Sequence, residues 1–92
     1  MKATGEIQVI PIGTGVSVRR EVKRAHEILA SSGLKVELHA TGTDVEGELS
    51  VILAAVEQIH ETLHAEGTVR LATFVKVATR TDKEPTLAAK QL

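Results

Sequence analysis

The chain has 92 residues, a formal net charge of −1 and a hydrophobic content of 42%, which together suit one domain with a single core. It contains no cysteine, which excludes disulfides, thiolate metal sites and cysteine nucleophiles and suits a reducing cytoplasm. Aromatic residues make up 1% of the chain and there is no basic excess, so nothing indicates nucleic-acid binding. No run resembles a signal peptide or a membrane span. We therefore expect a cytoplasmic protein of one domain (residues 1–92) with neither a membrane nor a nucleic-acid partner.

The hydrophobic period changes repeatedly along the chain and predicts strands and helices in turn. In chain order these are a strand at 5–12, a helix at 17–32, a strand at 34–40, a short strand ending near Gly47, a helix at 49–66 and a strand at 69–77. Ser17 is the expected N-cap of the first helix, and Gly33 and Gly67 are expected to end the two helices. A tight turn at 41–43 joins the second and third strands, and the tail from Thr81 is expected to form a turn followed by an arm.

The order strand-helix-strand-strand-helix-strand predicts the fold. Right-handed crossovers in each half give an α+β, ferredoxin-like domain, with a four-stranded antiparallel sheet and both helices on one face. Outward residues on the uncovered face would be polar in a monomer. Instead, that face is expected to carry the apolar residues Ile10, Ile12, Ala72, Phe74 and Ala78. An apolar patch there is typical of a subunit interface, so we expect a homodimer or homotetramer formed through the helix-free face.

Two loops rich in glycine and threonine form the candidate ligand site. The first contains Gly13, Thr14 and Gly15 and leads into the first helix. The second contains Thr41 and Thr43. Bare backbone and hydroxyl groups near a helix N-terminus can receive polar or anionic groups. Turn chemistry also explains each of these residues singly, and only their grouping indicates a pocket.

Two carboxylates, Glu46 and Glu48, flank Gly47 at the start of the second helix. A carboxylate beside a hydroxyl-rich loop could accept hydrogen bonds from an aminopyrimidine and offset positive charge on a ligand. Acidic residues also stabilise the first turn of a helix, so this simpler role stays open.

The histidines offer a weaker hypothesis. His60 and His64 stand four residues apart on the second predicted helix and could share a metal ion. No third ligand is evident, and the sequence around them is not a His-Glu-x-x-His motif. A solvated helix surface is the favoured interpretation, and we expect neither a metal nor a cofactor.

Missing residues narrow the functions open to a ferredoxin-like fold. Without asparagine, acylphosphatase-type catalysis is excluded, and without Cys-x-x-Cys so is a copper-chaperone role. Phe74 stands alone where an RNA-recognition motif needs several aromatic side chains. An enzyme acting on a heterocycle stays open, but no nucleophile or acid–base pair can be named for it. A small-ligand-binding module fits best, and an oligomeric interaction or regulatory module without a small ligand is the alternative.

Several segments, in order along the chain, resemble the small thiamine-binding, YkoF-like family. They are the Pro-Ile-Gly-Thr-Gly-x-Ser entry to the first helix at 11–17, residues 32–38, residues 42–49, and residues 80–83 with Lys90 near the end. The resemblance implies a ferredoxin-like protein that assembles as dimers and tetramers and lacks catalytic machinery. It also implies that the ligand is thiamine or its hydroxymethylpyrimidine moiety.

By that resemblance, the first loop with Ser17 and the segment 43–48 carry the ligand contacts. Together with the second loop, the candidate ligand-binding residues are Gly13, Thr14, Gly15, Ser17, Thr41, Thr43, Glu46 and Glu48. The sequence therefore predicts a non-enzymatic protein whose partners are a thiamine-like small molecule and further copies of itself.

Overall fold

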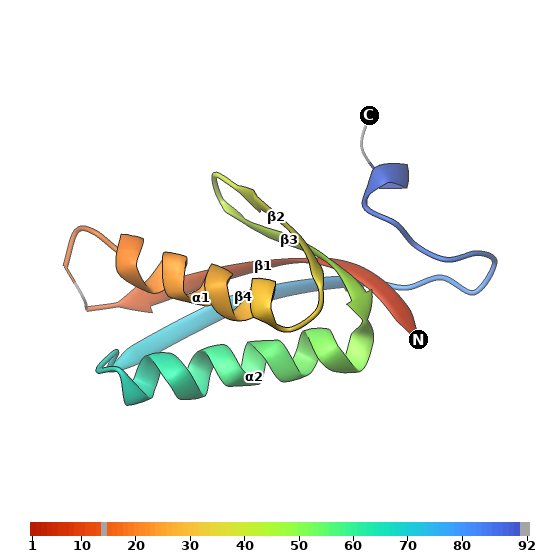
Figure 1. Cartoon of the computed structure of the whole chain (residues 1–92). Coiled ribbons are helices and arrows are strands. Elements are labelled where there is room, and N and C mark those ends of the chain that lie inside the picture. Colours follow the sequence, from red (N-terminus) through yellow and green to blue (C-terminus); the bar gives the residue numbers. More distant parts are fainter. Residues whose placement is uncertain (14, 91–92) are drawn as a thin grey trace.

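In the computed structural model, which describes residues 1–13 and 15–90, the chain forms a four-stranded antiparallel sheet with two α-helices on one of its faces (Figure 1). The elements are, in chain order, β1 (Lys2–Ile12), α1 (Arg19–Ser31), β2 (Lys35–His39), β3 (Gly42–Glu48), α2 (Leu49–Ala65), β4 (Arg70–Ala78) and a short 3₁₀ helix (Ala88–Lys90). The strand order is β2-β3-β1-β4, and every neighbouring pair is antiparallel. The predicted α+β ferredoxin-like fold is confirmed.

The first helix begins later than predicted. Val18 occupies its N-cap position and makes no side-chain capping bond, so the prediction that Ser17 is the N-cap is wrong. The reason lies in the backbone: the loop still runs through Ser17, and the first helical hydrogen bond joins the Val22 N–H to the Val18 carbonyl at 3.0 Å. Ser17 is therefore one residue too early to cap this helix.

The hairpin between β2 and β3 is tighter than predicted. His39 pairs with Gly42, so the turn consists of residues 40–41, and Thr43 lies inside β3. β1 also begins earlier than the predicted residue 5, because Lys2 already pairs with Glu48.

Both predicted helix ends are confirmed. Gly33 and Gly67 follow α1 and α2 with φ angles of 88° and 109°. Glycine adopts this left-handed conformation with little strain because it has no Cβ atom. The conformation ends the helix by directing the chain away from the helix axis. The Gly67 N–H donates to the carbonyl of His64 at 3.1 Å, which satisfies one of the last carbonyls of α2.

The hydrophobic core lies between the sheet and the two helices. Ile7 and Val45 point from the strands towards the helices and are at most 2% exposed. α2 contributes Ile52, Ile59 and Leu63, each 0% exposed. Removal of these branched side chains from water is the main stabilising term of the fold. Among the described residues, no helix combines the length and the apolar character needed to cross a membrane.

The helix-free face of the sheet has an apolar end. Ile10 pairs with Ala72 across β1 and β4, and Ile12 and Phe74 lie on the same face. Phe74 is 67% exposed. We call Ile10, Ile12, Ala72 and Phe74 the apolar patch, and its predicted outward orientation is confirmed by this register. Ala78 shares the face but lies at the other end of β4.

The tail after β4 turns back over the helix-free face. The Arg80 guanidinium donates two hydrogen bonds of 2.6 Å to the Asp82 carboxylate at the turn. Leu87, further along, is 6% exposed, and its N–H donates to Glu46 Oε1 at 2.8 Å. The predicted turn followed by an arm is confirmed, and the arm is docked on the sheet.

Candidate functional site

A pocket opens where β3 stops pairing with β1. β1 pairs with β3 only as far as Ile7, whereas its pairing with β4 continues to Ile12. On the β3 side, residues 8–11 therefore have no neighbouring strand within the described part of the chain. α1 and the tip of the β2–β3 hairpin enclose this gap as a pocket of about 340 Å³. That volume is in the range of small-molecule sites.

Apolar side chains form the walls of the pocket. Val9 and Pro11 come from β1, Val22 and Leu29 from α1, and Leu38 from β2. Pro11 has no N–H, so this unpaired edge of β1 exposes one backbone donor fewer than another residue would leave there. These walls can cover the faces of a flat ring.

The polar side of the pocket is the tip of the hairpin. Thr41 and Thr43 line it there, whereas His39, at the same tip, directs its imidazole to the other face of the sheet, towards Asp44. Thr43 is 5% exposed, and Thr41 lies in the exposed turn. Neither threonine hydroxyl forms a hydrogen bond with another described residue. A hydroxyl can both donate and accept, so this rim can orient a heterocycle that carries ring nitrogens and an amino group.

The described residues of the first predicted loop border the pocket without lining it. Gly13 and Gly15 turn the chain with φ angles of 81° and 98°. Neither of them, nor Ser17, is among the residues that line the pocket, whereas Val18 is. Thr14 lies outside the described residues. Of the two loops predicted to converge, the structure brings the second to the pocket and the described residues of the first only to its edge.

Glu46 and Glu48 lie on the other face of the sheet from Thr43, since their positions along β3 have opposite parity. Glu46 accepts the Leu87 N–H and lies 3.6 Å from Lys2 Nζ. The Leu87 hydrogen bond and the charge of Lys2 hold the pKa of Glu46 below its usual value, although burial opposes them. Glu48 Oε2 lies 3.0 Å from the N-terminal amine. Both glutamates are thus separated from the pocket, and their ligand roles stay predictions.

His60 and His64 each use a ring nitrogen within the fold. His60 Nε2 lies 2.7 Å from Thr73 Oγ1, and His64 Nδ1 lies 2.7 Å from the Thr68 carbonyl oxygen. His64 is exposed, as expected for a solvated helix surface, whereas His60 is half-buried. These bonds fix the two rings at a centroid separation of 6.1 Å.

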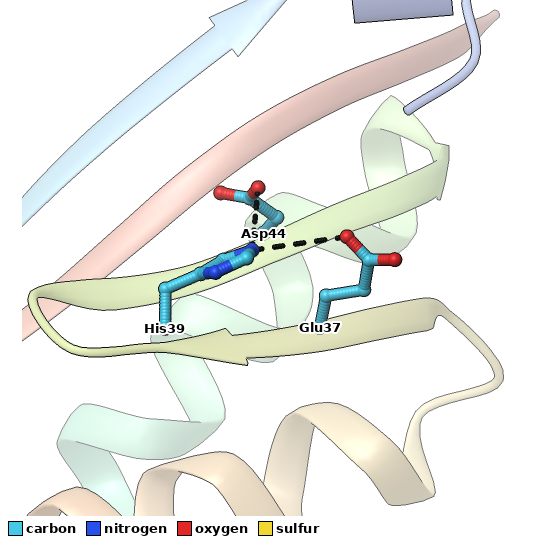
Figure 2. Close-up of side chains that lie close together, drawn as sticks. All are labelled: Glu37, His39 and Asp44. Atoms are coloured by element: carbon cyan, nitrogen blue, oxygen red, sulfur yellow. Dashed lines mark ion pairs between the residues drawn. The ribbon is translucent and has the colours of Figure 1, made fainter. Parts of the chain in front are cut away.

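A second group of polar side chains lies on the β2–β3 hairpin and was not predicted from the sequence. His39 Nε2 lies 3.1 Å from Asp44 Oδ2 and 3.7 Å from Glu37 Oε2 on the helix-free face (Figure 2). Glu37 and His39 are two residues apart on one strand, which places them on one face. The sequence did not predict this group because the position of Asp44 depends on the register in which β3 pairs with β2.

The fold is a ferredoxin-like α+β domain, and its pocket has mostly apolar walls and a rim of threonine hydroxyls. Such a pocket is large enough for one small molecule. The chain belongs to the family described as thiamine-binding protein, whose model matches residues 5–92. The resemblance predicted from the sequence is thereby confirmed. The family is named for binding rather than for a reaction.

Individual relatives agree with this assignment. A UPF0045 protein of Synechocystis sp. is 39% identical over 90 residues, which cover 98% of this chain and 74% of the relative. The crystal structure of a hypothetical protein from Methanocaldococcus jannaschii matches with a TM-score of 0.90 at 39% identity, covering 97% of this chain and 91% of that chain. A Thermotoga maritima protein, provisionally assigned to thiamine biosynthesis or salvage, matches with a TM-score of 0.85 at 26% identity, covering 98% and 95%.

Proposed function

We propose that this protein binds thiamine, or its hydroxymethylpyrimidine moiety, in the pocket between α1 and the β2–β3 hairpin. The observation that carries the proposal is a pocket of about 340 Å³ with apolar walls and two threonine hydroxyls that have no partner among the described residues. Membership of the thiamine-binding protein family supports the ligand class. The provisional role of the Thermotoga maritima neighbour in thiamine biosynthesis or salvage agrees with it.

The lining favours the pyrimidine part of thiamine. Among the described residues that line the pocket there is no carboxylate, and the one titratable residue, His39, directs its imidazole to the helix-free face. An uncharged aminopyrimidine suits this lining, because Thr41 and Thr43 can donate to a ring nitrogen and accept from the amino group. The cationic thiazolium ring would extend towards water, where its charge stays solvated.

Binding can be tested by thermal shift and calorimetry with thiamine and hydroxymethylpyrimidine separately. Both compounds should raise the melting temperature by mass action, because they bind the folded chain. Thr43→Val should weaken binding by about 0.5–1.5 kcal/mol, the usual net value of one hydrogen bond. Thr79→Val, beyond the end of β4, is the matched control and should leave the affinity unchanged. No heat and no thermal shift at millimolar concentration would favour the module without a small ligand.

Two further variants separate the pocket from the carboxylates predicted from the sequence. Glu46→Gln and Glu48→Gln remove one charge each on the other face of the sheet. If thiamine occupies the pocket, both variants should bind it as the unmodified chain does. If either glutamate contacts the thiazolium ring, its variant should lose about 1–3 kcal/mol for thiamine and little for hydroxymethylpyrimidine.

We also propose that the protein binds its ligand without transforming it, requires no cofactor and works in the cytoplasm. His39 is the one titratable residue among the described lining residues, and its imidazole lies on the helix-free face, whereas acid–base catalysis needs groups that reach the substrate. Mass spectrometry of thiamine after prolonged incubation with the protein should recover it unchanged. A new product that depends on the folded protein would make it an enzyme.

Self-association through the helix-free face completes the proposal. The apolar patch is supported as an interface by the exposure of Phe74, at 67%, on the edge strand β4, beside Ala72 and next to Ile10 of β1. An exposed aromatic side chain within such a patch is typical of a contact between subunits. A homodimer or homotetramer formed by that contact leaves the pocket on the helix-covered side open.

A further inference from the structure

The charged end of the helix-free face contains an assembled group of metal-ligating side chains. The turn at residues 40–41 folds β3 back so that Glu37 lies opposite Asp44 and His39 opposite Gly42. Because Gly42 has no side chain, the imidazole of His39 has room to lie across the hairpin towards Asp44. Figure 2 shows the His39 ring between the two carboxylates, with its nitrogen directed at both.

The spacing of the three ligand atoms matches that of a bound cation. His39 Nε2 is 3.1 Å from Asp44 Oδ2 and 3.7 Å from Glu37 Oε2, and all three atoms lie within 4.8 Å of one another. Ligands held about 2.1 Å from a tetrahedral Zn²⁺ are about 3.4 Å apart. The two distances to His39 bracket this value, and the carboxylates of Glu37 and Asp44 would close around the ion by rotation of their side chains.

The surroundings of the group supply negative charge and space. Glu6 lies over Gly42 so closely that a Cβ atom on residue 42 would come within 3.2 Å of Glu6 Cγ. Glu6 and Asp44 also line a pocket of about 270 Å³ on this face, together with Thr4 and Lys76. Thr4 is 1% exposed, and its hydroxyl has no hydrogen-bond partner among the described residues. An unpartnered buried hydroxyl leaves one hydrogen bond open for a polar occupant of that pocket, which Asp44 connects to the group.

We propose that Glu37, His39 and Asp44 bind one divalent transition-metal cation on the helix-free face, with water or Glu6 completing its coordination. One imidazole and two carboxylates form a ligand set suited to Zn²⁺ rather than to Mg²⁺, which prefers oxygen ligands and keeps its water. The group is half-exposed, so the cation can enter directly from solvent. This site and the proposed thiamine pocket lie on opposite faces of the sheet, although His39 belongs to the hairpin tip that borders the pocket.

The test is calorimetry of Zn²⁺ binding to the full chain without a histidine tag, after chelation and dialysis into phosphate-free buffer. We expect one Zn²⁺ per chain and no measurable heat with Mg²⁺. His39→Gln and Asp44→Asn should each weaken binding by at least about tenfold, since even outer-shell partners contribute 10–100-fold. His60→Gln, on α2, is the matched control and should bind as the unmodified chain does. Unchanged affinity in His39→Gln, or lost affinity in His60→Gln, would overturn the proposal.

A second measurement on the unmodified chain removes any dependence on how the variants fold. In NMR spectra, Zn²⁺ should shift the ring resonances of His39 and leave those of His26, His60 and His64 in place. Shifts centred on His60 and His64 would assign the ion to α2 instead and overturn the site. Because neither readout uses thiamine, failure of the proposed ligand would leave this result standing.

Discussion

The two faces of the sheet are made by alternate residues of the same strands, yet they differ in almost every property. The face under the helices is apolar and, apart from the pocket, its centre is buried, with Ile7 and Val45 at most 2% exposed. The helix-free face carries the apolar patch around Phe74 on β1 and β4 and the charged group Glu37, His39 and Asp44 on the β2–β3 hairpin. Thr43 and Asp44 are neighbours in the sequence, but the first lines the ligand pocket and the second belongs to the ionic group. One hairpin can therefore serve two sites, because successive residues point in opposite directions.

The two faces also contribute to different properties: the helix-covered face to the stability of the fold, and the helix-free face to the proposed self-association. Buried side chains under the helices hold the fold, whereas Phe74 is too exposed in one chain to contribute much. Substitutions on the two faces should accordingly move different observables.

The largest effect on stability is expected under the helices. Ile59→Ala should lower the free energy of unfolding by about 2–5 kcal/mol, because Ile59 is 0% exposed and the substitution leaves a cavity. Leu53→Ala, on the outer side of the same helix at 51% exposure, should cost less than about 1 kcal/mol. Urea unfolding at one fixed protein concentration measures both. Equal losses would mean that α2 does not pack as described.

The next effect is expected on association. Phe74→Glu should weaken self-association by about 2 kcal/mol or more, since it places an unpaired charge among apolar side chains. Sedimentation at micromolar concentration should show subunits for this variant and an oligomer for the unmodified chain. Leu53→Glu, on the helix side, should sediment as the unmodified chain does. A monomer for the unmodified chain would contradict the interface.

A smaller effect concerns Glu46 and the docked arm. The pKa of Glu46 is lowered in the folded chain, first by the Leu87 N–H, so the unfolded chain takes up this proton more readily as the pH falls. The stabilisation is therefore complete above the ordinary value of 4.5 and is lost as the pH falls through the folded value. Urea unfolding across this range should give a shallower pH dependence for Glu46→Gln than for the unmodified chain. Parallel curves would mean that the Leu87 contact does not stabilise the carboxylate.

The smallest effect is expected from metal removal. The hydrophobic core is built without the Glu37, His39 and Asp44 group, so exhaustive chelation should leave the chain folded and lower the melting temperature by a few degrees at most. Far-UV circular dichroism with and without a chelator checks this. Cooperative unfolding on chelation, restored by Zn²⁺, would make the cation structural.

Much of this fold follows from the sequence because its hydrophobic periods are clean. The alternation at 34–40 and the helical stripe at 49–66 each specify one element, and right-handed crossovers then leave one arrangement. The start of α1 could not be placed correctly, because Ser17 is a good N-cap by residue type and the loop geometry decided otherwise. In such cases the conformation of the preceding loop, and not the capping propensity of one residue, determines where the helix begins.

The site was less predictable, and the reason is geometric. Thr43 and Glu46 are close in sequence and were grouped as one site, but an odd spacing on a strand sends them to opposite faces. The charged group depends instead on hairpin register, since a turn one residue longer would move Asp44 away from Glu37. Residue types alone carry no information on that register.

The proposal that a thiamine-like ligand occupies the pocket is tested most directly by following backbone amide resonances during a titration with hydroxymethylpyrimidine. The largest changes should fall on residues that line the pocket, namely Val18, Val22, Thr41, Gly42 and Thr43. Resonances of Glu48 and Leu87, on the other face, should stay in place. Changes centred on Glu46, Glu48 and Leu87, with the pocket unaffected, would contradict the proposal and move the ligand to the helix-free face.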